Sequence, residues 1–207
     1  MKRFKAKQFI AAMFGSSAGI IAVLFFLMLG ISAGTFSALQ LAGEEKEQIL
    51  SLLSQYLLLS DPTAEPVFES VLRSSLMNHL VLLLVILLSG LSVVAFPAAM
   101  IALTYKGLAI GFSAALLIDN MDLKGLAVAM ASILPQNLLI LPGLMLGAMA
   151  ALFYALEAIR LRSQGIRKNL ASGAGPYLLV FLPAALLVIA GSFIESALCP
   201  VLIRLIV

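Results

Sequence analysis

Long apolar runs separated by short polar segments dominate the chain, and they cover residues 9–36, 77–104, 107–118, 125–158 and 177–199. A helix needs roughly 20 apolar residues to cross the hydrocarbon core of a bilayer, where every backbone polar group must find a hydrogen-bond partner within the protein. We therefore predict an all-α, polytopic helical bundle with about five transmembrane helices. The run 107–118 is short for one crossing and 125–158 is long, so we expect irregular structure in both.

Composition supports a single membrane domain over residues 1–207 in contact with membrane lipid. Hydrophobic residues make up 62% of the chain and charged residues only 11%, whereas about a quarter of a soluble domain is charged. The net charge is +3, and the basic residues stand beside apolar runs, a pattern that gives no support to nucleic-acid binding. The basic start with the long run 9–36 exceeds the apolar core of a secretory signal, so we expect this run to remain as the first helix.

Basic residues predict the orientation, because Lys and Arg near the membrane ends favour the cytoplasmic side. Most of them fall on one side if the N terminus is cytoplasmic: Lys2, Arg3, Lys5, Lys7, Lys106, Arg160, Arg162, Arg167 and Lys168. The predicted N terminus is thus cytoplasmic and the C terminus outside. A basic loop at about 160–176 is then cytoplasmic, and a polar loop at about 37–76 is extracytoplasmic.

The loop 37–76 carries two amphipathic helical patterns. The first follows the acidic stretch 44–47, which suits a helix N terminus, and the second follows Pro66. These apolar stripes pack on the bundle, lie in the outer leaflet or dock a partner protein. The candidate docking residues are Leu53, Tyr56, Phe68, Val71 and Leu72.

Glycine pairs at GxxxG spacing recur in the apolar runs, and this motif lets helix backbones approach closely in lipid. The pairs are Gly15 with Gly19, Gly30 with Gly34, Gly107 with Gly111, and Gly143 with Gly147. Packing within one chain is the simpler interpretation, and self-association or contact with a partner helix is the alternative.

The sequence Pro135-Gln136-Asn137, followed by Pro142, predicts a helix break inside the longest apolar run, because proline removes a helical donor. Either the two amides satisfy the freed backbone groups, or the break binds a transported solute, as broken helices do in transporters.

Catalytic, metal-binding and cofactor-binding patterns are absent from the sequence. His79 is the only histidine, and no HExxH, GxSxG, P-loop or GxGxxG motif occurs. We place His79 at the outer end of a span, expect an outer turn near 119–124, and place Glu195 near the outer end, where it can pair with Arg204 or contact a partner. No paired intramembrane charges are evident. We predict no enzymatic activity.

A set of residues in the second half of the chain carries a family resemblance: Lys106-Gly107, Gly111-Phe112, Asn120-Met121, Gly125, Leu134-Pro135-Gln136-Asn137, Pro142, Glu195 and Pro200-Val201-Leu202. With these residues the chain resembles the stage II sporulation protein M family. The likeness extends in pattern to the length, the helix spacing and the acidic outer loop.

The resemblance implies a membrane scaffold for endospore formation. In that family the protein is understood to gather stage II sporulation proteins D and P, which degrade peptidoglycan, at the septal or engulfing membrane of the mother cell during engulfment. The alternative is a channel or transporter for a small solute, which should show paired intramembrane charges or a repeat between its halves.

Overall fold

The computed structural model describes residues 6–58, 67–92, 95–163 and 170–206, and these residues are almost entirely helical, with no strand among them. The elements are α1 (Ala6–Phe14), α2 (Ser17–Leu39), α3 (Gly43–Leu58), α4 (Val67–Leu91), α5 (Pro97–Ser163), α6 (Leu170–Ala197) and α7 (Cys199–Arg204). An all-α membrane bundle is thereby confirmed.

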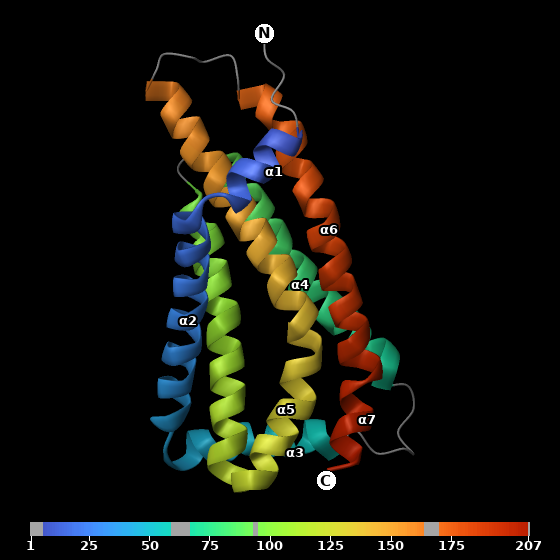
Figure 1. Cartoon of the computed structure of the whole chain (residues 1–207). Helices are drawn as coiled ribbons and strands as arrows, with labels where there is room; N and C mark the ends of the chain where they lie inside the picture. Colours follow the sequence, from blue (N-terminus) through green and yellow to red (C-terminus); the bar gives the residue numbers. More distant parts are fainter. Residues whose placement is uncertain (1–5, 59–66, 93–94, 164–169, 207) are drawn as a thin grey trace.

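The described residues contain four helices that are long and apolar enough to cross a membrane, and one of them folds back on itself, which gives five long membrane-type segments. Helix α5 has 67 residues, which would reach about 100 Å if straight. It reverses at Asp122, whose φ of 49° and ψ of −126° are not helical (Figure 1). We call residues 97–121 the first limb and 123–163 the second limb.

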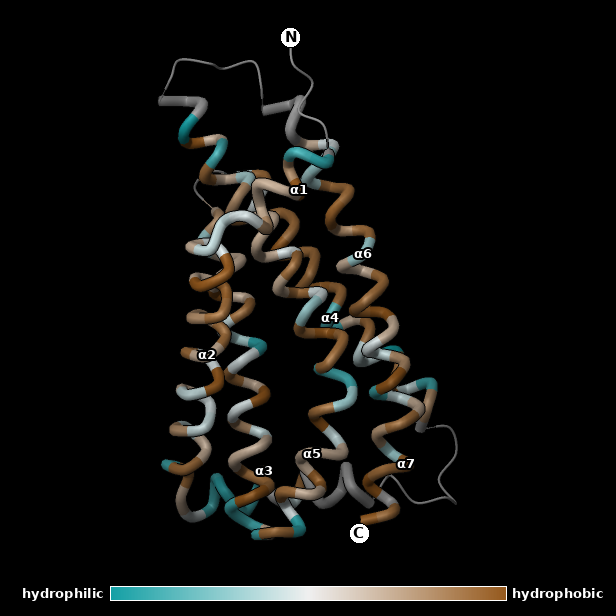
Figure 2. The backbone as a smooth tube through the Cα atoms, in the orientation of Figure 1, coloured by the Kyte–Doolittle hydropathy of each residue, from teal (hydrophilic) through white to brown (hydrophobic). Residues whose placement is uncertain are grey.

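The two ends of the bundle differ in what they carry. Helix α1, the start of α5 and the end of the second limb lie at one end, and α3, the Asp122 turn and α7 lie at the other (Figure 1). We call the latter the α3 end. Figure 2 shows apolar residues along the long helices and hydrophilic residues collected at α3 and the α5 turn. The outer turn predicted near 119–124 coincides with this reversal.

Two predicted helix boundaries are wrong. The run 9–36 contains two helices, because the chain turns at Gly15 and Ser16, and the Ser16 hydroxyl caps α2 by accepting from the Gly19 amide at 3.2 Å. The run 77–104 is also divided: α4 ends at Leu91 and α5 begins at Pro97. The fixed φ of proline suits the first turn of a helix, so Pro97 begins the next span well before Lys106.

The predicted helix break at Pro135 and Pro142 is wrong as well. Both prolines lie inside the second limb, and Asp122 is the residue of α5 with non-helical φ and ψ. Helices in lipid tolerate proline where neighbouring groups compensate for the lost backbone bond. The irregular position of this region is therefore the Asp122 turn, and Gln136 and Asn137 lie on a continuous helix.

The apolar core lies between α4, both limbs of α5 and α6. Its fully buried members include Ile86, Leu103, Ile140, Leu144 and Val188. At the end opposite α3, the rings of Tyr154 and Tyr177 stack with centroids 4.7 Å apart, and α1 joins the core through an edge contact between Phe9 and Phe153.

Glycines bring α2 and the first limb of α5 into backbone contact. A Cβ on Gly34 would overlap the carbonyl of Leu108, and a Cβ on Gly111 would overlap the carbonyl of Ile31. Gly30 faces Thr104 and Gly107 faces Leu27 in the same way. The glycine pairs of the two helices thus pack against each other within one chain.

The remaining glycine pairs behave differently. Gly143 lies against α6, where an added Cβ would be 2.9 Å from the Ala184 carbonyl oxygen, and Gly147 lies between Leu83 of α4 and Phe181 of α6. The atoms nearest to Gly15 and Gly19 belong to α1 and to Ser16. This first pair therefore makes no helix-to-helix contact within the described part of the chain, and its role in contact with a second copy or a partner helix stays a prediction.

Candidate functional site

Polar and charged residues lie deep inside the spans of the bundle. At about 1.5 Å of rise per residue, Lys106 lies about 14 Å beyond Pro97, which is half the thickness of a hydrocarbon core of about 30 Å. His79 lies midway along α4. Both residues differ from their expected places, since Lys106 was placed at the cytoplasmic boundary and His79 at the outer end of a span.

Four of these side chains form a continuous set of contacts across three elements. The Nζ atom of Lys106, on the first limb, is 2.8 Å from Nε2 of His79 on α4. The Nδ1 atom of His79 is 2.8 Å from the carbonyl oxygen and 3.2 Å from the hydroxyl of Ser75, one turn earlier. The Ser75 hydroxyl donates to Oε2 of Glu195, on α6, at 2.6 Å. We call these four residues the polar chain.

The contacts fix the direction of every donor in the polar chain. A protonated lysine has donors only, so Nε2 of His79 accepts from Lys106 and Nδ1 carries the ring proton. This proton faces the Ser75 carbonyl and hydroxyl oxygens, and the hydroxyl proton faces Glu195. Donors therefore point the same way from Lys106 through His79 and Ser75 to Glu195.

Burial divides the polar chain into a dry middle and two half-buried ends. His79 is 7% exposed and Ser75 is 4% exposed, whereas Lys106 and Glu195 are half-buried. An isolated charge inside a membrane span is costly, and such residues pair with one another. Oε2 of Glu195 lies 3.9 Å from Nδ1 of His79, and Lys106 contacts the same ring, so ionisable groups meet inside the spans, which the sequence did not indicate.

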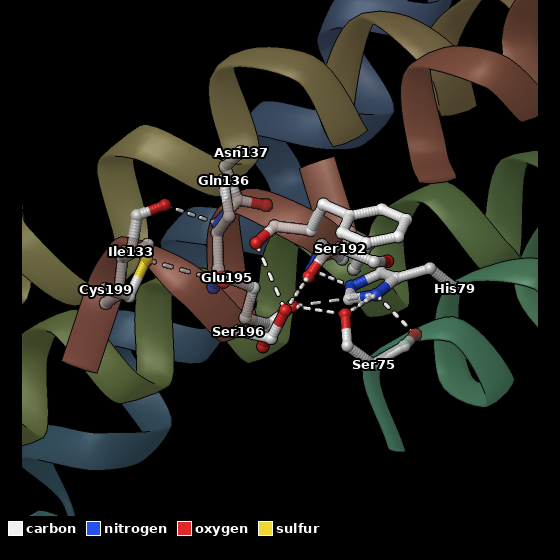
Figure 3. Close-up of polar contacts among 11 residues, drawn as sticks. Ser75, His79, Ile133, Gln136, Asn137, Ser192, Glu195, Ser196 and Cys199 are labelled. Atoms are coloured by element: carbon white, nitrogen blue, oxygen red, sulfur yellow. Dashed lines mark hydrogen bonds and ion pairs between the residues drawn. The ribbon is translucent and has the colours of Figure 1, made fainter. Parts of the chain in front are cut away.

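The second limb adds two amides beside the polar chain (Figure 3). Gly191 allows α6 to approach, since a Cβ there would lie 3.0 Å from the Gln136 carbonyl oxygen. The Gln136 side chain accepts from the Cys199 thiol at 4.0 Å. Asn137 donates to the Ile133 carbonyl of its own helix at 2.7 Å.

These amide contacts do not match the first interpretation of the proline motif. A proline frees the carbonyl four residues earlier, which is Ala131 for Pro135 and Leu138 for Pro142. The Asn137 side chain bonds to neither of these carbonyls. Its Oδ1 and the Ser192 hydroxyl are buried without a hydrogen-bond partner within the described ranges. Ser192 lies one turn before Glu195 on α6, so unused hydrogen-bonding capacity is present on the same helix as this carboxylate.

Helix α3 lies across the α3 end of the bundle and is fixed there by two contacts. The Lys46 ammonium is 2.6 Å from Oδ2 of Asp119, just before the α5 turn, and Ile49 packs on a cluster that contains Ala38 and Leu116. The Leu52 side chain is 65% exposed. Helix α3, which we call the α3 ledge, thus carries an exposed apolar residue at Leu52.

The structure places part of the candidate docking set. Phe68 is 45% exposed, with its ring centroid 6.5 Å from that of Phe193, and Val71 and Leu72 are half-buried on the first turns of α4. The side chains of Leu53 and Tyr56 lie outside the described part of the structure. The described residues also contain no group of three His, Cys, Asp or Glu side chains that could hold a metal ion.

The family model described as Stage II sporulation protein M matches residues 21–200. The chain belongs to this family. The match spans every membrane crossing of the bundle, and it includes α3 and the whole polar chain. No curated protein and no solved structure matches the chain.

Several residues by which the chain resembles the stage II sporulation protein M family meet in space. Lys106 and Glu195 form the two ends of the polar chain, while Gln136 and Asn137 lie beside α6 (Figure 3). Sequence reasoning treated these residues one by one and did not connect them. These residues lie at a similar depth inside the spans, and this similarity could have linked them. It could be recognised only if α5 was known to begin at Pro97.

Proposed function

We propose that this sporulation-related membrane protein is a non-enzymatic scaffold for forespore engulfment. It gathers the peptidoglycan-degrading stage II sporulation proteins D and P at the septal or engulfing membrane of the mother cell. The observation that carries the proposal is the α3 ledge, which is fixed to the bundle by Lys46 and Ile49 and leaves Leu52 uncovered. The family membership supplies the sporulation context.

The scaffold requires the α3 end to face outwards, where peptidoglycan lies. The distribution of basic residues supports this orientation even without Lys106, which lies inside a span, because Lys and Arg near the N terminus and at 160–168 favour the cytoplasm. A reporter that is active only in the cytoplasm should work when fused after Lys168 and fail when fused near Thr63. An active reporter near Thr63 would overturn the orientation.

A recovery experiment tests the docking role of α3. The tagged protein, extracted from sporulating cells in mild detergent, should carry the two wall-degrading proteins with it. Leu52→Asp should release them, because burying a carboxylate in an apolar contact has a large desolvation cost. Leu123→Asp is the matched control, since Leu123 is 83% exposed at the same end of the bundle but lies outside α3.

The outcomes separate docking from other roles of the ledge. The proposal expects partner recovery with the wild-type protein and Leu123→Asp, and loss with Leu52→Asp. Unchanged recovery with Leu52→Asp would refute docking through this face. A fall in membrane insertion with Leu52→Asp would instead assign the face to the outer leaflet.

A second candidate function, a channel or transporter for a small solute, is favoured by one specific observation. Transport sites within membranes use ionisable residues that face the bundle interior and pair with one another, and Lys106, His79 and Glu195 meet this description. The sequence-based argument against a transporter therefore no longer holds.

A further inference from the structure

The polar chain is an unbroken series of hydrogen bonds at the middle depth of the bundle. Its three contacts, from Lys106 to His79, from His79 to Ser75 and from Ser75 to Glu195, are 2.8, 3.2 and 2.6 Å long. Lys106 lies about 14 Å from the start of α5, and Glu195 lies about 14 Å before Arg204 near the opposite end, at about 1.5 Å per residue. The chain thus bridges the centre of the membrane region.

We propose that the polar chain is a proton relay, through which the protein passes protons across the centre of the bundle. The inference rests on the second candidate function and names the proton as the transferred species. It does not depend on the scaffold role, because none of the four residues belongs to the α3 ledge.

The transfer balances without any additional reactant. Lys106 gives a proton to Nε2 of His79, Nδ1 of His79 gives its proton to the Ser75 hydroxyl, and Ser75 gives its own proton to Glu195. The products are a neutral amine, the other neutral tautomer of His79, an unchanged hydroxyl and a carboxylic acid. Lys106 then takes a proton from its side and Glu195 releases one to the other. Before the next transfer the ring must also return to its first tautomer, by moving the proton from Nε2 back to Nδ1, and the hydroxyl to its first orientation.

Burial distinguishes a relay from a simple ion pair. A direct contact between Lys106 and Glu195 would neutralise both charges, yet here two neutral groups that both donate and accept protons stand between them. These two groups, His79 and Ser75, are buried, so bulk water does not replace their bonds. The ends of the relay, Lys106 and Glu195, are only half-buried, and the relay assigns proton entry to the first and proton release to the second.

Independent support comes from the surroundings of Glu195. Oδ1 of Asn137 and the hydroxyl of Ser192 are buried without a partner within the described ranges, and Figure 3 shows Ser192 between Glu195 and the His79 ring and Asn137 beside Gln136. Both oxygens can accept from a hydronium ion or water that leaves the carboxyl group. The titratable groups that the described elements bring here are His79 from α4, Lys106 from α5, Glu195 from α6 and Cys199 from α7.

Proton flux into liposomes tests the relay. Purified protein is reconstituted into vesicles that contain a pH-sensitive dye, and a potassium gradient with valinomycin drives proton entry. The wild-type protein should acidify the interior faster than protein-free vesicles. Ser75→Ala should lower the protein-dependent flux about tenfold or more, because a positioned proton-transfer group contributes roughly 10²–10⁴-fold to a rate.

Two control variants separate proton transfer from packing. Ser75→Thr keeps the hydroxyl and should keep the flux. Ser89→Ala removes another buried hydroxyl of α4, one that bonds to the Ile86 carbonyl of its own helix, and should also keep the flux. If Ser75→Ala elutes as an aggregate, His79→Gln tests the relay in its place. A glutamine cannot exchange a proton between two ring nitrogens, so the proton flux of His79→Gln should fall as expected for Ser75→Ala.

Two results would overturn the relay: wild-type flux equal to that of protein-free vesicles, or unchanged flux in both Ser75→Ala and His79→Gln. Neither result affects the scaffold, which partner recovery tests separately. Uptake of a solute by the same vesicles without proton flux would retain the transporter function and refute only the relay.

Discussion

The two faces of the first limb of α5 make different kinds of contact: one packs backbone against backbone, and the other carries an ionisable side chain. One face meets α2 through Gly107 and Gly111, where backbone lies against backbone and no charge is present. The other face places Lys106 against His79 of α4, and the contacts continue from His79 through Ser75 to the carboxylate of Glu195 on α6. The first limb thus has the glycine contact with α2 on one face and the polar chain on the other.

The difference teaches where stability comes from in lipid. Without a hydrophobic driving force between helices, close packing and interhelical hydrogen bonds hold a membrane bundle together. The glycine contact has both, since Thr104 donates to the Phe26 carbonyl at 3.1 Å across the contact. Buried charges contribute little net stability, because desolvation offsets their attraction. The glycine contact should therefore dominate folding, and the polar chain should be retained for function.

The largest effect is expected when the glycine contact is filled. Gly34→Leu or Gly111→Leu should abolish accumulation of folded protein, because each new side chain would meet a backbone carbonyl that cannot rotate away. Overpacking of a core costs about 1–3 kcal/mol even when side chains can adjust, and we expect a larger loss here. Membrane accumulation and size-exclusion profiles in detergent measure it.

Gly175→Leu provides the control for that experiment. It introduces the same side chain into α6 at a glycine with no neighbouring atom within 4 Å of an added Cβ. Equal accumulation of all three variants would contradict the structural role of the α2–α5 contact.

Separating the charges of the polar chain should have an intermediate effect. Lys106→Met leaves Glu195 without its opposite charge, and removing one partner of a buried pair costs about 3–5 kcal/mol. Because Lys106 and Glu195 are only half-buried, we expect the loss in free energy of unfolding to lie at the lower limit of this range, about 3 kcal/mol. The double variant Lys106→Met with Glu195→Gln should regain part of this loss in thermal unfolding, because the two positions are coupled. Strictly additive losses would show that the two charges do not interact.

The smallest effect is expected for Asn137→Leu. This substitution removes the bond to the Ile133 carbonyl and also a buried oxygen that has no partner among the described residues. The two changes oppose each other, so the free energy of unfolding should change by less than about 1 kcal/mol. Thermal unfolding in detergent measures it, and a loss as large as that of Lys106→Met would show that Oδ1 is hydrogen-bonded in the membrane.

Sequence reasoning succeeded where local pattern decides the structure. Apolar runs correctly predicted the fold class, and the polar stretch near Asp122 correctly predicted the turn. It failed at Lys106, because a lysine between two apolar runs resembles the end of a span. The contact with His79, which is far away in the sequence, holds this residue inside the bundle. The helix break predicted from Pro135 and Pro142 failed for a similar reason, because neighbouring helices stabilise the second limb and it stays helical at both prolines.

GxxxG spacing shows the same limit. The motif identifies helices that can approach closely, yet it does not state which helix fills the gap. Gly30, Gly34, Gly107 and Gly111 meet one another, whereas Gly15 and Gly19 flank a turn. The polar chain was not predicted at all, because its members come from three helices.

The position of the wall-degrading proteins in sporulating cells tests the scaffold most directly. Fluorescent fusions of stage II sporulation proteins D and P should gather at the septum when the wild-type chain or Ser75→Ala is present. They should spread over the membrane when the chain is deleted or carries Leu52→Asp. Septal enrichment of both fusions in cells without the chain would contradict the scaffold.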